Sequence, residues 1–311
     1  MSWLLCNSRE GSKHILNKTC PICDENVGFK VVYPENLPVT NKMINYSGRK
    51  APDAYHYEMV RCNRCNLLFA NSIYDDDMVN KLYSDSAFDY ENELLGLKKT
   101  YTKCLMSGMA ILSNKNRMLD IGCGNGFMLE EAIKVGWKNV TGIELSSKAI
   151  DCANINIKQR IINKPFYSKY FNENHFDLIF SAMVIEHFTD INRFFSDVNK
   201  ILRPGGVQVI IAHNESHFLS KLLKNKHPII NDEHVSVFSP KTLEKILQKH
   251  NFEIISIKSL KNYYPIKYWL KMLPINSKAK SIINKCLNKS NMGMKQIGIK
   301  AGNIVALVKK R

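Results

Sequence analysis

Short apolar runs alternate with amphipathic stretches through the middle of this chain. The runs have the length and composition of buried strands, and the stretches between them repeat their apolar positions with a helical period. The predicted strands are 117–121, 140–143, 176–180 and 207–211, and the predicted helices are 127–135, 148–157 and 191–202. This alternation is typical of βαβ units, so we predict an α/β domain built on a parallel sheet.

The same domain is expected to continue to the end of the chain, over residues 114–311. Ser239–Pro240 predicts a helix start, because serine is a good N-cap and proline suits the first helical position. Further strands are predicted at 252–257 and 303–308, and between them a basic helical insertion at about 262–300. These strands would complete the sheet.

Four of the nine cysteines form two CxxC pairs within residues 1–75, Cys20 with Cys23 and Cys62 with Cys65. Two residues between thiolates let a tight turn direct both sulfurs at one ion, and two such turns complete a tetrahedral S4 shell. Because all four positions are then filled by protein, we predict a structural zinc site. Chance pairs or a redox dithiol are the alternatives.

The long separation of the two pairs implies an inserted hairpin or loop around 31–57. Short β-like pieces at 29–33 and 67–69 favour a small zinc-ribbon domain over residues 1–75. Residues 76–113 are expected to form a helical linker or a lid on the substrate side.

Composition then narrows the class of protein. The chain has 311 residues, 45% hydrophobic and 23% charged, which is typical of a globular protein with a substantial core. No apolar run approaches the 18 or so residues that span a bilayer, and the N-terminus lacks a signal-peptide pattern. We therefore expect a cytoplasmic protein.

The net charge of +16 is concentrated near the C-terminus. From Pro240 onward there are 16 Lys and Arg residues and only two acidic ones, Glu244 and Glu253. Aromatic residues at 263–269 lie among these lysines. Such a region suits nucleic acid, an anionic membrane surface at the inner face or a phosphorylated substrate, and a simple solvated face is the alternative.

The most informative segment is the glycine-rich stretch 118–127. A strand ends at Asp120, and the glycines that follow form a turn into a helix, where a ligand can approach the backbone closely. Glu144 ends the next strand, where an acidic side chain suits the two hydroxyls of an adenosine ribose. Asp120 would repel a pyrophosphate and suits a cationic amino-acid end, which favours S-adenosylmethionine over a dinucleotide.

At this point the sequence resembles the class I S-adenosylmethionine-dependent methyltransferases, over about residues 115–260. Four blocks in the family's order carry the resemblance: 119–126, 140–146, 176–187 and 201–206. It implies a Rossmann-like, seven-stranded sheet. It also implies that Asp120 organises the methionine end of the cofactor and that Glu144 holds the ribose.

The resemblance implies further cofactor contacts. They are Gly122, Cys123, Gly124 and Gly126 in the turn, Leu145 beside the adenine, and Ser181 beside the methionine moiety. The segment 162–166 lacks the acidic residue that many members place near the adenine amine, so contacts from it are left open.

Methyl transfer from a sulfonium needs proximity, orientation and a base for the acceptor. His187 at the tip of the fourth strand and His234 in a later loop are the candidate bases, and each has a structural alternative as a capping or core histidine. Similar ubiquinone-pathway O-methyltransferases bind a metal through a Glu-x-x-Glu-His run. Met183 stands at the first acidic position here, so we expect no catalytic metal.

A CxxC ribbon before such a core resembles enzymes of bacterial surface-polysaccharide and sugar-modification pathways. In these enzymes the second pair runs into an apolar strand and a Tyr-containing segment, as 61–69 runs on to 82–83 here. The expected acceptor is therefore a hydroxyl, or a carbon, of a sugar on a nucleotide or lipid carrier. An RNA methyltransferase and a non-catalytic zinc and cofactor-binding scaffold are the alternatives.

Overall fold

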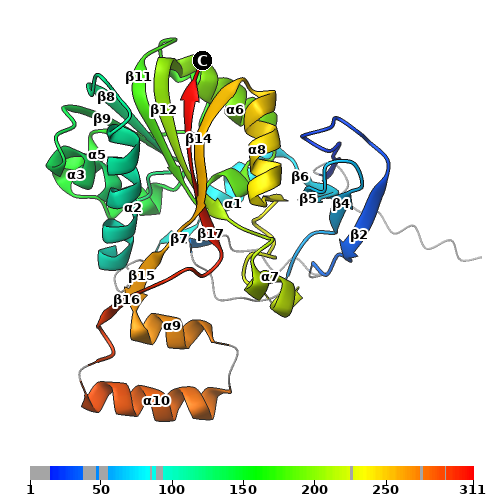
Figure 1. Ribbon diagram of the computed structural model, residues 1–311, viewed down its shortest axis with the longest axis vertical. Helices are drawn as coiled ribbons and strands as arrows, with labels where there is room; N and C mark the ends of the chain where they lie inside the picture. The colour runs from blue at the N-terminus through cyan, green and yellow to red at the C-terminus, as the bar shows by residue number, and fades with distance from the viewer. Residues whose placement is uncertain are drawn as a thin grey trace, which may run out of the picture.

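The computed structural model describes residues 15–37, 47–48, 55–84, 86–88, 94–224, 227–273, 276–290 and 292–311. Its centre is a seven-stranded sheet in the order β10-β9-β8-β11-β12-β17-β14 (Figure 1). All neighbouring strands are parallel except at β17, which runs antiparallel to both β12 and β14. The Rossmann-like, seven-stranded fold that the sequence predicts is therefore confirmed.

The strands of this sheet follow the predicted apolar runs closely. In sheet order they are β10 (Ile161–Asn163), β9 (Asn139–Glu144), β8 (Arg117–Ile121), β11 (Phe176–Ala182), β12 (Leu202–His213), β17 (Asn303–Lys310) and β14 (Phe252–Ser259). β12 begins five residues before the predicted strand 207–211, so Pro204–Gly206 lie inside it.

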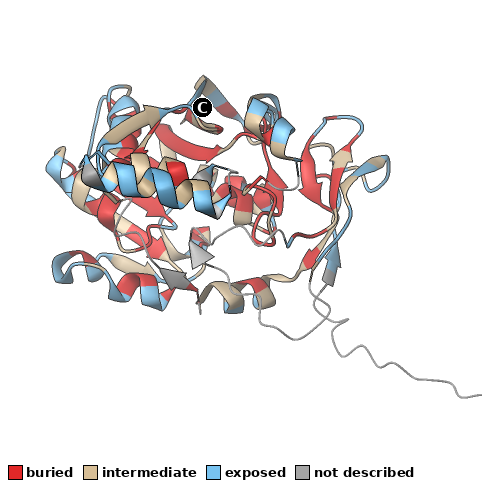
Figure 2. Cartoon of the chain, turned by 90° about the horizontal axis from the view of Figure 1, so that it is seen from below, coloured by how far each residue is buried: buried red, intermediate tan, exposed pale blue. Residues whose placement is uncertain are grey.

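Helices cover both faces of the sheet and bury a separate apolar cluster on each. On one face lie α2 (Leu94–Met109), α3 (Phe127–Lys134) and α5 (Ile155–Lys158), and on the other lie α6 (Ile191–Ile201) and α8 (Pro240–Lys249). The buried residues concentrate along the sheet between these layers (Figure 2). A packed core of this kind holds the strand ends, and with them the site, in fixed positions.

One predicted helix is divided in the structure, and another begins at the predicted residue. The helix expected at 148–157 is divided into α4 (Ser147–Asp151) and α5, because Asn154 adopts an extended ψ of 143° and starts a new turn. The start at Ser239 is confirmed, since its side chain accepts a hydrogen bond from the Thr242 backbone in a capping box.

The cysteine-rich region forms a four-stranded sheet beside the central one. Its order is β13-β5-β4-β2, built from β2 (Phe29–Tyr33), β4 (Met59–Cys62), β5 (Leu68–Ala70) and β13 (Ser236–Val237). β1 (Ile15–Asn17) pairs with β6 (Ser72–Tyr74) in a separate two-stranded sheet. The chain thus adds a strand from its later half, β13, to the cysteine-rich sheet.

Several short elements gather at the carboxyl ends of the parallel strands. They are α1 (Asp76–Ser84), the pair β3 (Ser47–Gly48) and β7 (Ala87–Phe88), the 3-10 turns Ser168–Tyr170 and Ile185–His187, and α7 (Phe218–Leu223). The region between β14 and β17 is a paired β15 (Asn262–Pro265) and β16 (Gln296–Ile299), which carries α9 (Ile266–Met272) and α10 (Ser277–Lys289) at its tip (Figure 1).

Among the described residues, no helix is long and apolar enough to cross a membrane.

Candidate active site

A cavity of about 720 Å³ opens at the carboxyl ends of the parallel strands. The glycine-rich turn after β8 and the end of β9 line one part of it, while α1, α7 and α9 contribute to its walls. Ligands of open α/β sheets bind at this edge, because strand ends and helix starts expose backbone groups and side chains there. The glycine-rich turn and Glu144, which the sequence predicts to bind the cofactor, therefore line the same cavity.

The glycine turn needs its glycines for two different reasons. Gly122, Gly124 and Gly126 all have left-handed φ angles, of 69°, 55° and 72°. A Cβ on Gly122 would lie 2.6 Å from a methyl of Val184, and one on Gly126 would lie 2.5 Å from a methyl of Ile157. Glycine is the residue that tolerates both conditions.

Cys123 and the first two of these glycines line the cavity, where a cofactor contact is predicted for them. Gly126 does not line it. It stands at the N-cap of α3, against Ile157, and so shapes the turn without offering a surface to the ligand. Its predicted cofactor contact stays a prediction.

Glu144 is held in position by the turn that it faces. One carboxylate oxygen accepts the backbone N–H of Gly124 at 2.8 Å, and the other accepts those of Leu145 and Ser146 at 2.8 and 2.9 Å. Burial raises the pKa of this carboxyl, and the three N–H donors oppose the shift. The carboxylate is thus pre-oriented at the end of β9, and Leu145 lines the cavity beside it.

Asp120 lies at the end of β8, in the same cavity, with only 3% of its surface exposed. Burial raises its pKa well above the ordinary value, and the negative charge of Glu144 raises it further. A cation bound in the cavity would remove this penalty. The pair therefore favours a ligand that has hydroxyl groups at one end and a positive charge at the other.

Ser181 is not among the residues that line the cavity, and its predicted cofactor contact stays a prediction. Its side chain is fully buried, and its hydroxyl lies 3.3 Å from the side-chain nitrogen of Gln208, which donates to it. Successive side chains of a strand point to opposite faces, so its neighbours Phe180 and Ala182 line the cavity instead.

The two predicted bases, His187 and His234, lie close together on the cavity wall, with ring centroids 4.8 Å apart. His234 donates through Nδ1 to the carbonyl of Ile229 at 2.8 Å, which leaves the lone pair on Nε2. Burial lowers the pKa of His234 to about 4 and that of His187 to about 3. Both rings are therefore neutral at neutral pH.

His187 is more constrained than His234. Its Nδ1 lies 3.1 Å from the carbonyl oxygen of Glu233 and also contacts the hydroxyl of Tyr83 on α1. The backbone of Met183 faces the ring as well and opposes the lowering of its pKa. These contacts favour an orienting role for His187 and leave His234 as the better-placed acceptor of a proton.

The sequence did not identify three residues that share this wall, Tyr83, His213 and His227. His213 ends β12, and its ring centroid lies 5.0 Å from that of His234. A histidine at the carboxyl end of a predicted strand was a usable signal. Tyr83 was singled out only as part of the Tyr-containing segment after the second CxxC pair, and the folding of α1 over the sheet edge brings it to the site.

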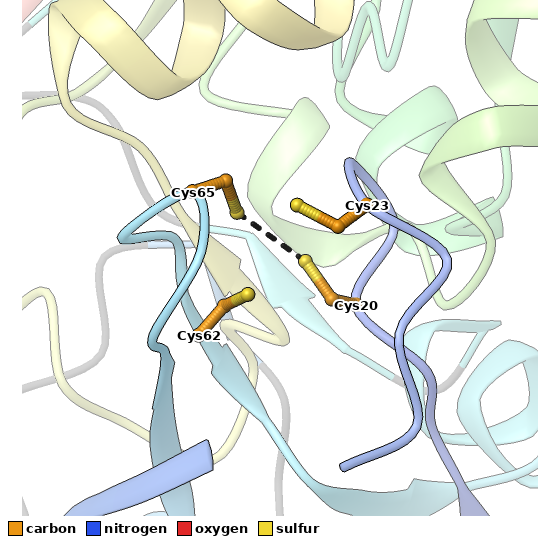
Figure 3. Close-up of side chains that lie close together, drawn as sticks. All are labelled: Cys20, Cys23, Cys62 and Cys65. Carbon is orange, nitrogen blue, oxygen red and sulfur yellow. Dashed lines mark hydrogen bonds between the residues drawn. The ribbon is translucent and has the colours of Figure 1, made fainter. Parts of the chain in front are cut away.

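The four cysteines of the CxxC pairs converge on one point (Figure 3). All four sulfurs lie within 4.8 Å of one another, and those of Cys20 and Cys65 are 3.4 Å apart. Tetrahedral zinc with sulfur ligands at 2.3 Å requires sulfurs about 3.8 Å apart. The donor set and the spacing therefore fit zinc.

The cysteine-rich sheet is joined to the histidine loop. The strand β5, which follows the second CxxC pair, pairs with β13 through Phe69 opposite Ser236. The backbone N–H of Ala70 donates to the carbonyl of Val235 at 3.0 Å, and that of Val235 donates to Glu186 at 2.8 Å. His234 is thus fixed between the two sheets.

A family model matches more than half of this chain. The profile of a methyltransferase domain matches residues 97–257, which is 161 of the 311 residues and so more than half of the chain. Among solved structures, an S-adenosylmethionine-dependent methyltransferase from Archaeoglobus fulgidus is similar, at 17% identity and a TM-score of 0.49. The alignment covers 76% of this chain and 100% of that one.

Curated relatives are similar over shorter stretches. A ubiquinone biosynthesis O-methyltransferase of Bradyrhizobium sp. (strain ORS 278) is 30% identical over 104 residues, 32% of this chain and 41% of that protein. One from Bartonella tribocorum is 26% identical over 156 residues, 45% and 61% of the two chains. The chain thus spans between two fifths and about three fifths of these relatives' length. With its seven-stranded sheet and the profile match together, the chain belongs to the methyltransferase domain family, in its class I form.

Proposed function

We propose that this protein transfers a methyl group from S-adenosylmethionine to a hydroxyl of a small-molecule acceptor. The observation that carries the proposal is the joint placement of Glu144 and Asp120 in one cavity with the His187 and His234 pair. Glu144 would accept a hydrogen bond from a ribose hydroxyl. Asp120 is charged when the cofactor's ammonium group offsets its burial, and Leu145 flanks the adenine.

When bound, the cofactor supplies a methyl group on a sulfonium, which is already activated toward displacement. The work left for the protein is orientation and removal of the acceptor's proton. His234 takes that proton on Nε2, because its Nδ1–H is committed to the carbonyl of Ile229. His187, bound to Tyr83 and Glu233, orients the acceptor oxygen.

Oxygen is favoured as the acceptor atom by two observations. The curated relatives are named O-methyltransferases. A neutral histidine with an available lone pair also matches the need of a hydroxyl, which must lose a proton as the new bond forms. We propose as acceptor a sugar on a nucleotide or lipid carrier of surface-polysaccharide biosynthesis, as the cysteine-rich region leads us to expect. Lys271 at the cavity is available to a carrier phosphate.

The cysteine cluster is proposed to hold a structural zinc ion. Cys20, Cys23, Cys62 and Cys65 supply four sulfurs and leave no coordination position for a substrate. The zinc would hold the ends of β2, β4 and β5 together beside the histidine loop.

The test is transfer of a radiolabelled methyl group from S-adenosylmethionine into a cell lysate, which is then separated into nucleotide-sugar, lipid-linked saccharide and RNA fractions. We expect label that resists ribonuclease, in a saccharide fraction. His234→Gln should lose transfer by roughly the 10²–10⁴-fold of a lost general base and keep its affinity for S-adenosylhomocysteine. Label that disappears with ribonuclease would replace the saccharide by RNA, and binding without transfer to any fraction would leave a scaffold.

A further inference from the structure

The end of the molecule that carries α7, α9 and α10 has an unusual surface. These three helices lie at the same end in Figure 1, beyond the carboxyl edge of the sheet. Residues 261–300 contain nine lysines and no aspartate or glutamate. Within the described part of the chain, none of these lysines forms an ion pair with a carboxylate. The positive charge of this segment is therefore available to a partner.

Large apolar side chains are exposed among these lysines. On α10, Ile282 is 64% exposed and shares one helix face with Lys278 and Lys285, at spacings of four and three residues. Leu273, after α9, is 49% exposed. A solvated face would carry the lysines without the leucine and isoleucine, because exposed apolar area of this kind has no benefit in water.

The short helix α7 continues the same pattern. Phe218 and Leu222, four residues apart, are 65% and 71% exposed, and Lys221 lies exposed between them. The opposite face of the helix, with Leu219 and Leu223, lines the cavity. We call the exposed residues of these helices the basic apolar face: Lys221, Phe218, Leu222, Lys271, Leu273, Lys278, Ile282 and Lys285.

The cavity opens onto this face. Lys271 and Leu273 belong to both the face and the cavity wall, so they mark its rim. Tyr268 and Trp269 of α9 lie just inside, with ring centroids 5.7 Å apart. Aromatic rings, lysines and exposed aliphatic side chains around one opening are the combination that rests at the headgroup level of a bilayer.

We propose that the basic apolar face docks on an anionic lipid bilayer, with the mouth of the cavity toward the membrane. Charge complementarity selects the bilayer: unpaired lysines meet anionic headgroups, and the aliphatic side chains enter the acyl boundary. RNA would use the lysines and leave Ile282, Leu273 and Phe218 without a role. An acceptor on a lipid carrier would then reach the site from the membrane. This last step rests on the proposed methyl transfer.

Vesicle binding tests the docking without using methyl transfer. We expect the protein to co-sediment with vesicles of phosphatidylcholine and phosphatidylglycerol, to bind phosphatidylcholine alone much more weakly, and to dissociate at high salt. Ile282→Ser should weaken binding by roughly fivefold through lost apolar burial, and the double variant Lys278→Glu with Lys285→Glu by roughly tenfold or more.

Matched controls exist on other faces. Ile155, 80% exposed on α5, allows the same Ile→Ser change, and the exposed Lys115 and Lys138 allow the same double charge reversal. These variants should bind vesicles like the unmodified protein. Binding of S-adenosylhomocysteine should stay unchanged in all variants, which keeps the docking separate from the proposed function.

Four results would overturn the docking. The first is no binding to anionic vesicles, and the second is an equal loss of binding in the control variants. The third is an Ile282→Ser protein that binds vesicles normally, together with a charge reversal that weakens binding to vesicles and to single-stranded RNA by the same factor. The fourth is a dimer, seen by light scattering, that Ile282→Ser dissociates, because the face would then be covered by a second copy.

Discussion

Replacing Glu144 tests the cofactor assignment most directly. A carboxylate offers about four lone-pair sites, and backbone N–H groups of Gly124, Leu145 and Ser146 occupy three of them. One site remains for a ribose hydroxyl. A hydrogen bond to a charged group contributes about 1.5–3 kcal/mol, so Glu144→Ala should weaken S-adenosylhomocysteine binding by roughly 10- to 150-fold.

Isothermal titration calorimetry of the purified protein provides the measurement. Glu144→Gln is expected to lose affinity as well, because its amide nitrogen would face at least one of the backbone N–H donors in either orientation. Glu173→Ala serves as the charge-matched control, since Glu173 is exposed and lies outside the cavity. Its affinity should equal that of the unmodified protein.

A loosened turn would also lower affinity, because Glu144 holds Gly124. A deoxyribose analogue of S-adenosylhomocysteine separates the two causes. If Glu144 binds the ribose, removing the hydroxyls should cost the unmodified protein most of the same 10- to 150-fold and cost Glu144→Ala almost nothing. Equal losses in both proteins would refute the ribose contact, even if the substitution itself weakens binding.

Protonation and metal content give three further tests. Burial raises the pKa of Asp120, and a bound ammonium group lowers it, so binding of S-adenosylhomocysteine should release protons and tighten as the pH rises. Calorimetry in buffers of different ionisation enthalpy should show this proton release. The variant Asp120→Asn should abolish the release. Metal analysis should find one zinc ion per chain, lost with a lower Tm in Cys62→Ser and kept in the exposed Cys152→Ser. Because the pKa of His234 falls from 6.5 to about 4 on folding, its stabilising effect is complete above pH 6.5 and is lost as the pH falls toward 4. Urea denaturation at pH 7 and at pH 5 gives the free energy of unfolding at each pH. Between the two, this free energy should fall by about 2 kcal/mol more in the unmodified protein than in His234→Gln. Equal falls in the two proteins would contradict the lowered pKa of His234.

The strands of the central sheet could be predicted because they are buried on both faces, which requires nearly continuous apolar runs such as 117–121 and 176–182. The helix that divides at Asn154 was harder to predict. Its apolar spacing continues through the break, and only the local backbone at that residue decides the boundary. β13 has two residues and no distinct pattern, so its pairing with β5 is visible only in the fold.

The cofactor side of the site was more predictable than the acceptor side. Asp120 and Glu144 each end a strand next to a recognisable turn, so their positions follow from local sequence. Ser181 lies between two residues of β11 that line the cavity, and the alternation of side chains along this strand places Ala182 in the wall. Tyr83 reaches His187 from 104 positions away, a contact that depends on how the whole chain packs.

The cysteine cluster is connected to His234 through the paired strands β5 and β13. Cys65 lies three residues before β5, and β5 pairs with β13, which begins two residues after His234. Lys249 on α8 adds a second link, since its side chain donates to the carbonyl of Pro21 and to Asp24 beside the first CxxC pair. A short loop between two sheets has little freedom when both sheets are fixed. If the cluster holds the proposed zinc ion, its loss should therefore disturb the histidine side of the cavity and spare Glu144, whose donors all belong to the glycine turn and the end of β9.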